Sequence, residues 1–308
     1  MKIIFMGNSL IGYPILNALH HSKHELLAVV SNVPKRFGRG RSLSYTPVGQ
    51  LAKELKLNFF PVESLNNEVL QDNISMLKAD LFVVVAFRIL PKSFLLLSKK
   101  GAINLHGSLL PQYRGAAPIQ HALLNDDDLT GISTFLIDKN LDTGPIILQK
   151  NIPIIEKDTY DSLSDKMAEN GIGLILESLD LLDGDKFIPV PQVKTKVSYA
   201  PKIPNKMFEI DWSFSAIKIK NKVRALCYSG AFTFLSGKRI KIYDSKVVDI
   251  NKNSDIAGEI DVIDNSRMIV NCGDDKLELL EIQVEGKQRM PVIDWLKGAQ
   301  IKSGDFLG

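Results

Sequence analysis

Three side chains of different chemistry lie in one short part of the sequence. Asn104 and His106 are two residues apart in the segment AINLH, which reads as a short strand, so both would point to the same face of a sheet. Asp142 follows a second expected strand, in the turn LDTGP. An amide can polarise a carbonyl, an imidazole can move a proton, and a carboxylate can orient the imidazole. The three residues are therefore candidates for an acyl-transfer site.

Each of the three also has a purely structural interpretation. A single histidine in a strand is often packed and hydrogen-bonded without any catalytic role, and an asparagine at a strand end often bonds to the backbone. The sequence Asp-Thr-Gly is typical of a turn. The spacing of the residues and their apolar flanks leave both interpretations open.

The elements that would position these residues follow from the apolar pattern. Apolar segments at 2–6 and 26–30 enclose a helical pattern around 14–19, and this β-α-β order predicts a parallel sheet. The segment LFVVVA at 81–86 is apolar throughout, as expected for a strand covered on both faces. Ligands of such sheets bind beyond the carboxyl ends of the strands, where residues 87–91 follow. The glycines of the first turn do not form the G-x-G-x-x-G pattern, so we expect no dinucleotide site.

The last third of the chain has a different pattern. Short apolar segments separated by Gly or Asn turns follow a helix at 216–226, which predicts a small β-barrel of the OB type. Residues 188–205 contain four prolines and little periodicity, which is typical of a linker. We therefore predict an α/β protein with a Rossmann-like parallel-sheet domain at 1–187, a linker at 188–205, and an OB-like domain at 206–308.

Composition sets limits on the class of protein. The 308 residues are 45% hydrophobic and 24% charged, which is ordinary for a globular protein. The net charge is only +3, so a site for a polyanion would have to be local. The two cysteines, Cys227 and Cys272, lack metal-type spacing, and no apolar run could span a bilayer. We expect a cytoplasmic monomer with reduced cysteines and no metal. The acidic run at 126–128 is interpreted as a solvated turn rather than a metal site.

One local concentration of charge lies at 34–44, PKRFGRGRSLS. It contains no acid and four bases: Lys35, Arg36, Arg39 and Arg41. Two glycines keep the segment pliable. It could be a solvated loop, or an arm that neutralises RNA phosphates. A further excess of bases lies between residues 206 and 246, on the expected barrel.

The segments NLHGSLLPQYRGAAPIQ and LDTGPI resemble the signature of the folate-dependent formyltransferases. The similarity extends to KIIFMG, FGRGRSLSYTPV, VVVAFRILP, SYAPKI with IDW, and GKQRM. The resemblance implies transfer of the formyl group of 10-formyltetrahydrofolate, as co-substrate, by the catalytic residues Asn104, His106 and Asp142. The basic segment and Ala116-Ala117-Pro118 favour the family member that formylates the α-amino group of initiator methionyl-tRNA for translation initiation.

The same resemblance assigns binding residues. The residues expected to contact the folate are Phe87, Arg88, Ile89, Leu90, Ser108, Leu109, Leu110 and Pro111. The four bases at 35–41 would contact tRNA, with Arg39 as the most important of them. A carboxylate beside His106 is expected to raise the pKa of the imidazole towards neutrality or above. The chain departs from the family pattern at Gly7-Asn8-Ser9, where Gly-Thr-Pro is usual, and in the shorter loop at 87–91.

Two alternatives remain. The first is a formyltransferase that acts on an amino sugar nucleotide and shares the three catalytic residues. The second is a noncatalytic RNA-binding protein that has kept the transferase fold. The basic segment argues against the first, and the intact set of Asn104, His106 and Asp142 argues against the second.

Overall fold

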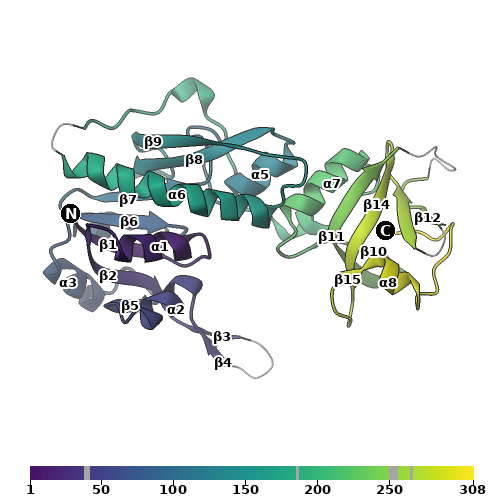
Figure 1. Ribbon diagram of the computed structural model, residues 1–308, viewed down its shortest axis with the longest axis horizontal. Coiled ribbons are helices and arrows are strands. Elements are labelled where there is room, and N and C mark those ends of the chain that lie inside the picture. Colours follow the sequence, from purple (N-terminus) through teal and green to yellow (C-terminus); the bar gives the residue numbers. More distant parts are fainter. Residues whose placement is uncertain (38–41, 185–186, 250–255, 264–265) are drawn as a thin grey trace. The chain divides into compact units, whose positions relative to one another are not determined.

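The computed structural model describes residues 1–37, 42–184, 187–249, 256–263 and 266–308 (Figure 1). The chain divides into two compact units, which we describe separately. The first contains residues 1–118, 129–153 and 164–200, and the second contains residues 119–128, 154–163 and 201–308. Within the described ranges, no helix combines the length and the apolar character that a membrane span requires.

The first unit is built on a seven-stranded sheet with the order β5-β2-β1-β6-β7-β8-β9. The five strands from β5 to β7 run parallel, and β8 and β9 are antiparallel to their neighbours. The strands are β1 (Lys2–Gly7), β2 (Glu25–Asn32), β5 (Phe59–Val62), β6 (Leu81–Val85), β7 (Ala102–His106), β8 (Leu129–Leu136) and β9 (Ile146–Pro153). The helices are α1 (Gly12–His20), α2 (Pro47–Glu54), α3 (Glu68–Met76), α4 (Lys92–Leu95) and α6 (Tyr160–Asp183), of which α6 begins in the second unit.

Apolar side chains cover both faces of this sheet, as its apolar strands predict. On one face, Met6 of β1 and Val84 of β6 pack in one cluster with Ile74 of α3. On the other face, Leu105 of β7 lies against Gly171 of α6, and Figure 1 shows α1 and α6 over the same side of the sheet. Side chains alternate along a strand, so the residues of β7 on either side of Leu105 point to the α3 face.

Local hydrogen bonds explain where two helices begin. The Oγ1 atom of Thr46 accepts a hydrogen bond from the backbone N–H of Gly49 at 3.0 Å and caps α2, as its Thr-Pro sequence predicts. The α6 helix begins at Tyr160, directly after its cap. Thr159 is the cap, because its Oγ1 accepts from the N–H of Ser162 at 3.3 Å while its own N–H donates to the Ser162 hydroxyl at 3.0 Å. Asp158 instead accepts from the N–H of Ile155 at 2.8 Å and closes the preceding turn.

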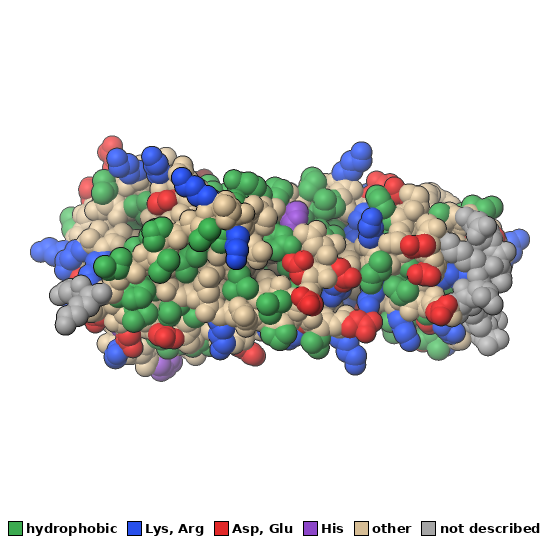
Figure 2. All heavy atoms as spheres, turned by 90° about the horizontal axis from the view of Figure 1, so that it is seen from above, with side chains coloured by type: hydrophobic (Ala, Val, Ile, Leu, Met, Phe, Trp, Pro, Cys, Tyr) green, Lys and Arg blue, Asp and Glu red, His purple; other side chains and the backbone are tan. Residues whose placement is uncertain are grey.

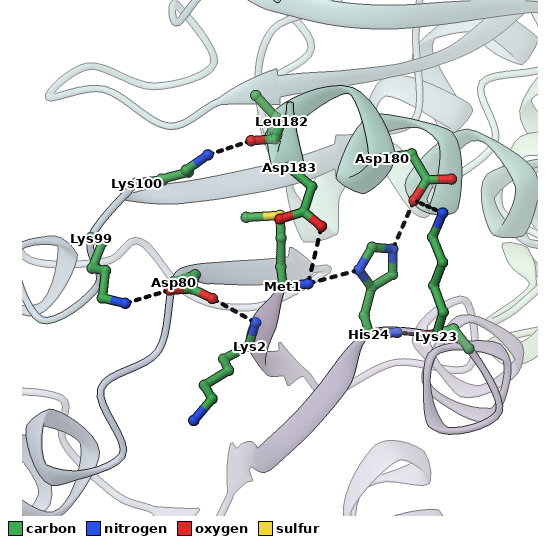
Figure 3. A network of polar contacts seen from close by, with 11 residues as sticks. Met1, Lys2, Lys23, His24, Asp80, Lys99, Lys100, Asp180, Leu182 and Asp183 are labelled. Atoms are coloured by element: carbon green, nitrogen blue, oxygen red, sulfur yellow. Dashed lines mark hydrogen bonds and ion pairs between the residues drawn. The ribbon is translucent and has the colours of Figure 1, made fainter. Parts of the chain in front are cut away.

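A partly buried charged network ties the start of β1 to the end of α6 (Figure 3). The amino group of Met1 lies 3.3 Å from Nδ1 of His24 and 3.4 Å from a carboxylate oxygen of Asp183. Nε2 of His24 lies 3.2 Å from Asp180, which also pairs with Lys23 at 2.9 Å. Burial lowers the pKa of His24, and the neighbouring amino group adds to this effect, whereas the two aspartates oppose it. The ring is therefore held mainly in its neutral form.

This network predicts a loss of stability in mild acid. The folded pKa of His24 lies below its ordinary value of 6.5, so between the two values the unfolded state binds more protons. The free energy of unfolding should therefore fall as the pH drops below about 6.5, with at most about 1.4 kcal/mol per pH unit from one histidine. Urea unfolding across this range should show a shallower pH slope for His24→Asn than for the unchanged protein. His20→Asn, at an exposed position, is the control, and equal slopes in all three proteins would contradict the prediction.

The second unit is an antiparallel β-domain with the strand order β10-β11-β14-β13-β12, to which β15 is added beside β14. Its strands are β10 (Ala231–Leu235), β11 (Lys238–Val248), β12 (Ile260–Ile263), β13 (Arg267–Asn271), β14 (Lys276–Val284) and β15 (Met290–Pro291). Its helices are α5 (Pro118–Leu124, whose first residue belongs to the first unit), α7 (Ala216–Ala225) and α8 (Val292–Leu296), with a 3-10 turn at Asn205–Phe208.

The end of the chain links the two edges of this sheet. Leu307 pairs with Leu235 of β10, and Phe306 pairs with Glu259 directly before β12. The backbone groups of both edge regions are thereby used within the unit, which limits pairing with other chains.

The sequence predicted the strands from β10 to β14 and α7, but it did not predict β15 or α8. The fold class, an α/β domain followed by an antiparallel β-domain, is confirmed.

The segment expected to be a linker is partly built into the first unit. Val190 pairs with Ile146 at the start of β9, and the first unit extends to Ala200, which is fully buried. A short 3-10 turn lies at Lys194–Lys196. The low periodicity of this segment therefore reflects irregular backbone packed on the first unit. The domain boundaries drawn from the sequence stay a prediction.

One face of the molecule carries a mixture of charged and hydrophobic side chains (Figure 2). On the face drawn in Figure 2, lysine and arginine side chains are spread among acidic and hydrophobic ones. This distribution agrees with the small net charge of +3.

Candidate active site

The carboxyl end of β7 carries the first two candidate catalytic residues. Asn104 is half-buried and His106 is buried, and the strand places both on the α3 face because they are two residues apart. The neighbours β6 and β8 pair with β7 on its two sides, which fixes its position in the sheet. The ring of His106 lies edge-on to Phe135 of β8, with 6.4 Å between the ring centroids.

Asp142 lies beside His106, although the two residues are far apart in the sequence. The distance from Nδ1 of His106 to Oδ2 of Asp142 is 3.7 Å. The same oxygen accepts a hydrogen bond from the backbone N–H of Gly115 at 2.8 Å. The side chains of His106 and Asp142 are 6% and 11% exposed, so water screens their interaction only weakly. The structure thus brings an imidazole and a carboxylate together, and Asn104 lies on the same face of β7 as the imidazole.

The hydrogen bonds of His106 indicate its protonation. Its Nε2 atom lies 2.8 Å from the carbonyl oxygen of Tyr113. A carbonyl oxygen can only accept, so Nε2 carries the hydrogen and the Nδ1 lone pair of the neutral ring faces Asp142. The pKa of His106 is lowered, because burial outweighs the raising effects of Asp142 and of the Tyr113 carbonyl. The expectation that Asp142 lifts this pKa to neutrality or above was therefore wrong, since it did not account for the loss of hydration.

The loop that carries Asp142 is fixed at several points. The hydroxyl of Thr143 donates to the carboxylate of Asp138 at 2.7 and 2.8 Å, and the N–H of Asn140 donates to the same group at 3.0 Å. A Cβ atom on Gly144 would lie 1.7 Å from the carbonyl oxygen of Leu136, so no other residue fits there without a shift. Asp142 itself has a φ of +53°, a left-handed conformation that a non-glycine residue adopts at some cost.

The second segment expected to contact folate follows β7 directly. Ser108 is fully buried and its hydroxyl donates to the carbonyl of Gln112 at 2.6 Å, and the side chain of Leu110 is buried as well. Ser133 of β8, which pairs with His106 across the sheet, donates to the carbonyl of Ser108 at 2.6 Å and accepts from the N–H of Leu110 at 3.0 Å. A contact of Ser108 or Leu110 with a ligand would therefore have to use the backbone. Pro111 is also buried, and Leu109 is half-buried.

Sequence reasoning missed two residues that hold this segment. Ser133 is the first, and Gln149 of β9 is the second, because its Nε2 donates to the carbonyl of Leu110 at 2.9 Å and to the Ser133 hydroxyl at 2.8 Å. The signal for Ser133 was a hydroxyl residue beside the apolar Ile132 in the strand LTGISTFL. Such a group has to find a partner when it is buried.

The first expected folate segment follows β6 at the same edge. Arg88 donates to the carbonyl of Glu63 at 2.7 Å and contacts the side chain of Asn32, so it braces the ends of β5 and β2. Its guanidinium lies 5.5 Å from the ring centroid of the half-buried Phe87. The side chain of Ile89 is 79% exposed, whereas Leu90 is buried.

The unusual first turn has a defined structure. The side-chain oxygen of Asn8 accepts from the hydroxyl of Ser31 at 3.0 Å and from the N–H of Asn32 at 2.9 Å, so it joins the ends of β1 and β2. The hydroxyl of Ser9 is buried, and it has no hydrogen-bond partner among the described residues.

The basic segment begins and ends in a β-hairpin, whereas Gly38 and Gly40, on which its expected pliability rests, lie outside the described residues. β3 (Lys35–Phe37) pairs with β4 (Ser42–Ser44), with Lys35 opposite Ser44 and Arg36 opposite Leu43. Lys35 and Arg36 are exposed. Arg39 and Arg41 lie outside the described residues.

A protein contact explains one of the three acidic residues in the turn at 126–128. Asp126 pairs with Arg224 at 2.9 Å within the second unit. Over the residues that the structure describes, no three His, Cys, Asp or Glu side chains are grouped as a metal ion would need.

Comparison with known proteins identifies the family. Residues 1–179 match the formyl transferase family, and residues 202–300 match the formyl transferase C-terminal domain. The chain is 39% identical over 311 residues to the methionyl-tRNA formyltransferase of Caldanaerobacter subterraneus subsp. tengcongensis, with all of both chains covered. The chain belongs to the methionyl-tRNA formyltransferase family. The family resemblance read from the sequence, and the prediction of a formyltransferase, are therefore confirmed.

Solved structures of methionyl-tRNA formyltransferases and related enzymes share the fold. The methionyl-tRNA formyltransferase from Clostridium thermocellum aligns with a TM-score of 0.59 at 14% identity, over 92% of this chain and 97% of that one. WlaRD, a sugar 3N-formyl transferase crystallised with dTDP and 5-N-formyl-THF, aligns with a TM-score of 0.69 at 19% identity, over 94% and 99%. At these identities the similarity concerns the fold alone, so it does not separate tRNA from sugar substrates.

Proposed function

We propose that this chain transfers the formyl group of 10-formyltetrahydrofolate to the α-amino group of initiator methionyl-tRNA, using Asn104, His106 and Asp142. The observation that carries the proposal is the buried pair of His106 and Asp142, 3.7 Å apart at the carboxyl end of β7, in a chain of this family. The carboxyl ends of parallel strands are the usual location of ligand sites in α/β sheets.

The three residues have separate roles in this proposal. The folate supplies an activated one-carbon group, so the protein has to position it, stabilise charge and manage a proton. Asn104 donates a hydrogen bond to the formyl oxygen as it gains negative charge. His106, with its pKa lowered by burial, is neutral at pH 7 and can accept a proton from the attacking amine. Asp142 then stabilises the positive charge that develops on the imidazole or the amine. As the new amide forms, the bond between the formyl carbon and the folate nitrogen breaks, and the imidazolium can return its proton to that nitrogen.

Features of the first unit fit a folate at this edge. The loop after β6 exposes the apolar side chain of Ile89 and carries the half-buried ring of Phe87, which suits a flat heterocycle. The turn after β1, the neighbouring strand, contains the buried hydroxyl of Ser9 that has no partner among the described residues. A polar group of a ligand would satisfy it. Phe87, Ile89 and the backbone of 108–111 are the groups that would hold the folate.

Two exposed basic surfaces, each on its own unit, support an RNA substrate. The β3–β4 hairpin carries Lys35 and Arg36 on its surface. On the second unit, the guanidinium of the exposed Arg239 lies 4.7 Å from the ring centroid of Phe232 and 5.8 Å from that of Phe234. Cations interleaved with aromatic rings suit both phosphates and bases.

The test is formyl transfer measured on three acceptors. Purified protein, supplied with 10-formyltetrahydrofolate, should formylate initiator methionyl-tRNA in preference to elongator methionyl-tRNA and should leave an amino sugar nucleotide unmodified. Preference for the amino sugar would replace the proposal with the alternative substrate. Failure to transfer formyl to any of the three acceptors, together with failure to bind folate, would favour a noncatalytic RNA-binding protein.

A further inference from the structure

The side chain of Gln192 holds the loop of Asp142 from a distant part of the chain. Its Nε2 atom donates to the carbonyl oxygen of Asp142 at 2.9 Å and to that of Gly144 at 2.8 Å. Its Oε1 atom accepts from Nε and Nη2 of Arg114 at 3.1 and 2.6 Å. Gln192 therefore bridges the Asp142 turn and the segment that follows His106.

Arg114 determines how the amide of Gln192 is oriented. A guanidinium only donates and a carbonyl only accepts, so the amide oxygen must face Arg114 and the amide nitrogen must face the two carbonyls. Arg114 is itself fixed by its backbone, since its N–H donates to the carbonyl of Ser198 at 2.9 Å and its carbonyl accepts from Ala200 at 2.8 Å. A single orientation of the Gln192 amide therefore satisfies all four of its side-chain hydrogen bonds.

The Asp142 turn needs such support. The left-handed backbone of Asp142, with a φ of +53°, persists only if its surroundings hold it. The hydrogen bonds from Thr143 to Asp138 close the loop through side chains, whereas Gln192 fixes the peptide carbonyls of Asp142 itself and of Gly144. Release of these carbonyls would leave the carboxylate of Asp142 with the hydrogen bond from Gly115 but without the support of its own turn, so that it could move away from His106.

We propose that Gln192 is a positioning residue for formyl transfer, which keeps the carboxylate of Asp142 beside His106 by holding the Asp142–Gly144 turn. Gln192 does not contact the reacting atoms and acts through Asp142. The proposal rests on the catalytic role assigned to Asp142 above. Through Gln192, the segment 190–200 would also contribute to the site.

The experiment compares Gln192→Met with Lys194→Met on the same segment. Methionine keeps the length and flexibility of glutamine but cannot donate to the two carbonyls, whereas Lys194 is exposed and serves as the control. We expect kcat to fall on the order of 10- to 100-fold in Gln192→Met, with KM for both substrates changed by less than about threefold, because displacement of a catalytic group by about 1 Å can cost this much. Lys194→Met should keep the kcat of the unchanged enzyme.

A second measurement does not depend on activity. NMR titration of the His106 ring in the ligand-free protein reports its pKa, which Asp142 raises against the effect of burial. Asp142→Asn should lower this pKa further, and Gln192→Met should shift it part of the way in the same direction. An unshifted His106 pKa or an unchanged kcat in Gln192→Met would overturn the proposal. If the shift occurs in a protein that transfers no formyl group, the positioning role of Gln192 stands and the proposed reaction fails.

A variant at Arg114 covers the case in which Gln192→Met does not fold. Arg114→Met leaves both donors of Gln192 in place and removes the group that orients its amide. It should lower kcat and the His106 pKa in the same direction and by less than Gln192→Met. No change in either quantity would also overturn the proposal.

Discussion

The Asn104→Ala variant should lower kcat for formyl transfer by about 10²–10³-fold while it keeps its fold, because one donor to the developing oxyanion is removed. Asn104 is half-buried in β7, and alanine is smaller, so the strand can accept the change without a clash. Steady-state formylation of initiator methionyl-tRNA gives kcat, and thermal unfolding shows whether the protein is folded.

Matched variants separate catalysis from structure in this prediction. Asn66→Ala changes an exposed asparagine of the same unit and should keep normal turnover. Asp142→Asn keeps the shape of the Asp142 side chain but removes its charge, and it should lower turnover severely as well. Near-normal turnover of a folded Asn104→Ala or Asp142→Asn protein would remove that residue from the mechanism.

Neutralising the basic segment should lower kcat/KM for tRNA without changing the affinity for folate. The change is the replacement of Lys35, Arg36, Arg39 and Arg41 by glutamine. We expect kcat/KM for tRNA to fall about tenfold or more at physiological salt, and the slope of log affinity against log salt to flatten by about 0.9 for each phosphate that the protein no longer neutralises. Folate affinity, measured by fluorescence quenching, should stay within about twofold of that of the unchanged protein, because folate binding does not depend on neutralised phosphates.

The control for this prediction removes the same kind of charge elsewhere. Lys56→Gln and Lys150→Gln change two exposed lysines of the same unit and should leave the salt slope unchanged. An unaltered slope in the hairpin variant would show that the segment does not bind phosphates. If the slope flattens, variants of Lys35 and Arg36 alone, which are exposed on β3, show how much of the effect comes from this strand rather than from Arg39 and Arg41.

Features that depend on nearby residues were predictable from the sequence. The shared face of Asn104 and His106 follows from their spacing of two in a strand, and the structure has this strand as β7. The cap of α2 at Thr46 follows from a Thr-Pro pair. The parallel sheet follows from apolar β-branched strands that alternate with amphipathic helices. These signals are local because strand alternation and helix capping involve residues within a few positions of one another.

Features that depend on contacts between distant segments were not predictable in this way. Gln192 reaches the carbonyl of Asp142 across 50 residues of sequence, and Arg88 bonds to Glu63 across 25. Sequence reasoning placed Gln192 in a linker and, through the family resemblance, Arg88 among the folate contacts. Neither a glutamine nor an arginine has a local pattern that reveals its hydrogen-bond partner.

For His106 too, the sequence determines some of the chemistry and the tertiary structure determines the rest. The order of residues establishes which groups are available, namely an amide, an imidazole and a carboxylate, and on which strand and turn they lie. The burial of the His106 ring, the position of its Nε2 against the carbonyl of Tyr113, and the lowering rather than raising of its pKa come from three-dimensional packing. The physical reason is that hydration depends on everything packed around the ring, and a charged imidazole loses more by leaving water than one carboxylate 3.7 Å away returns.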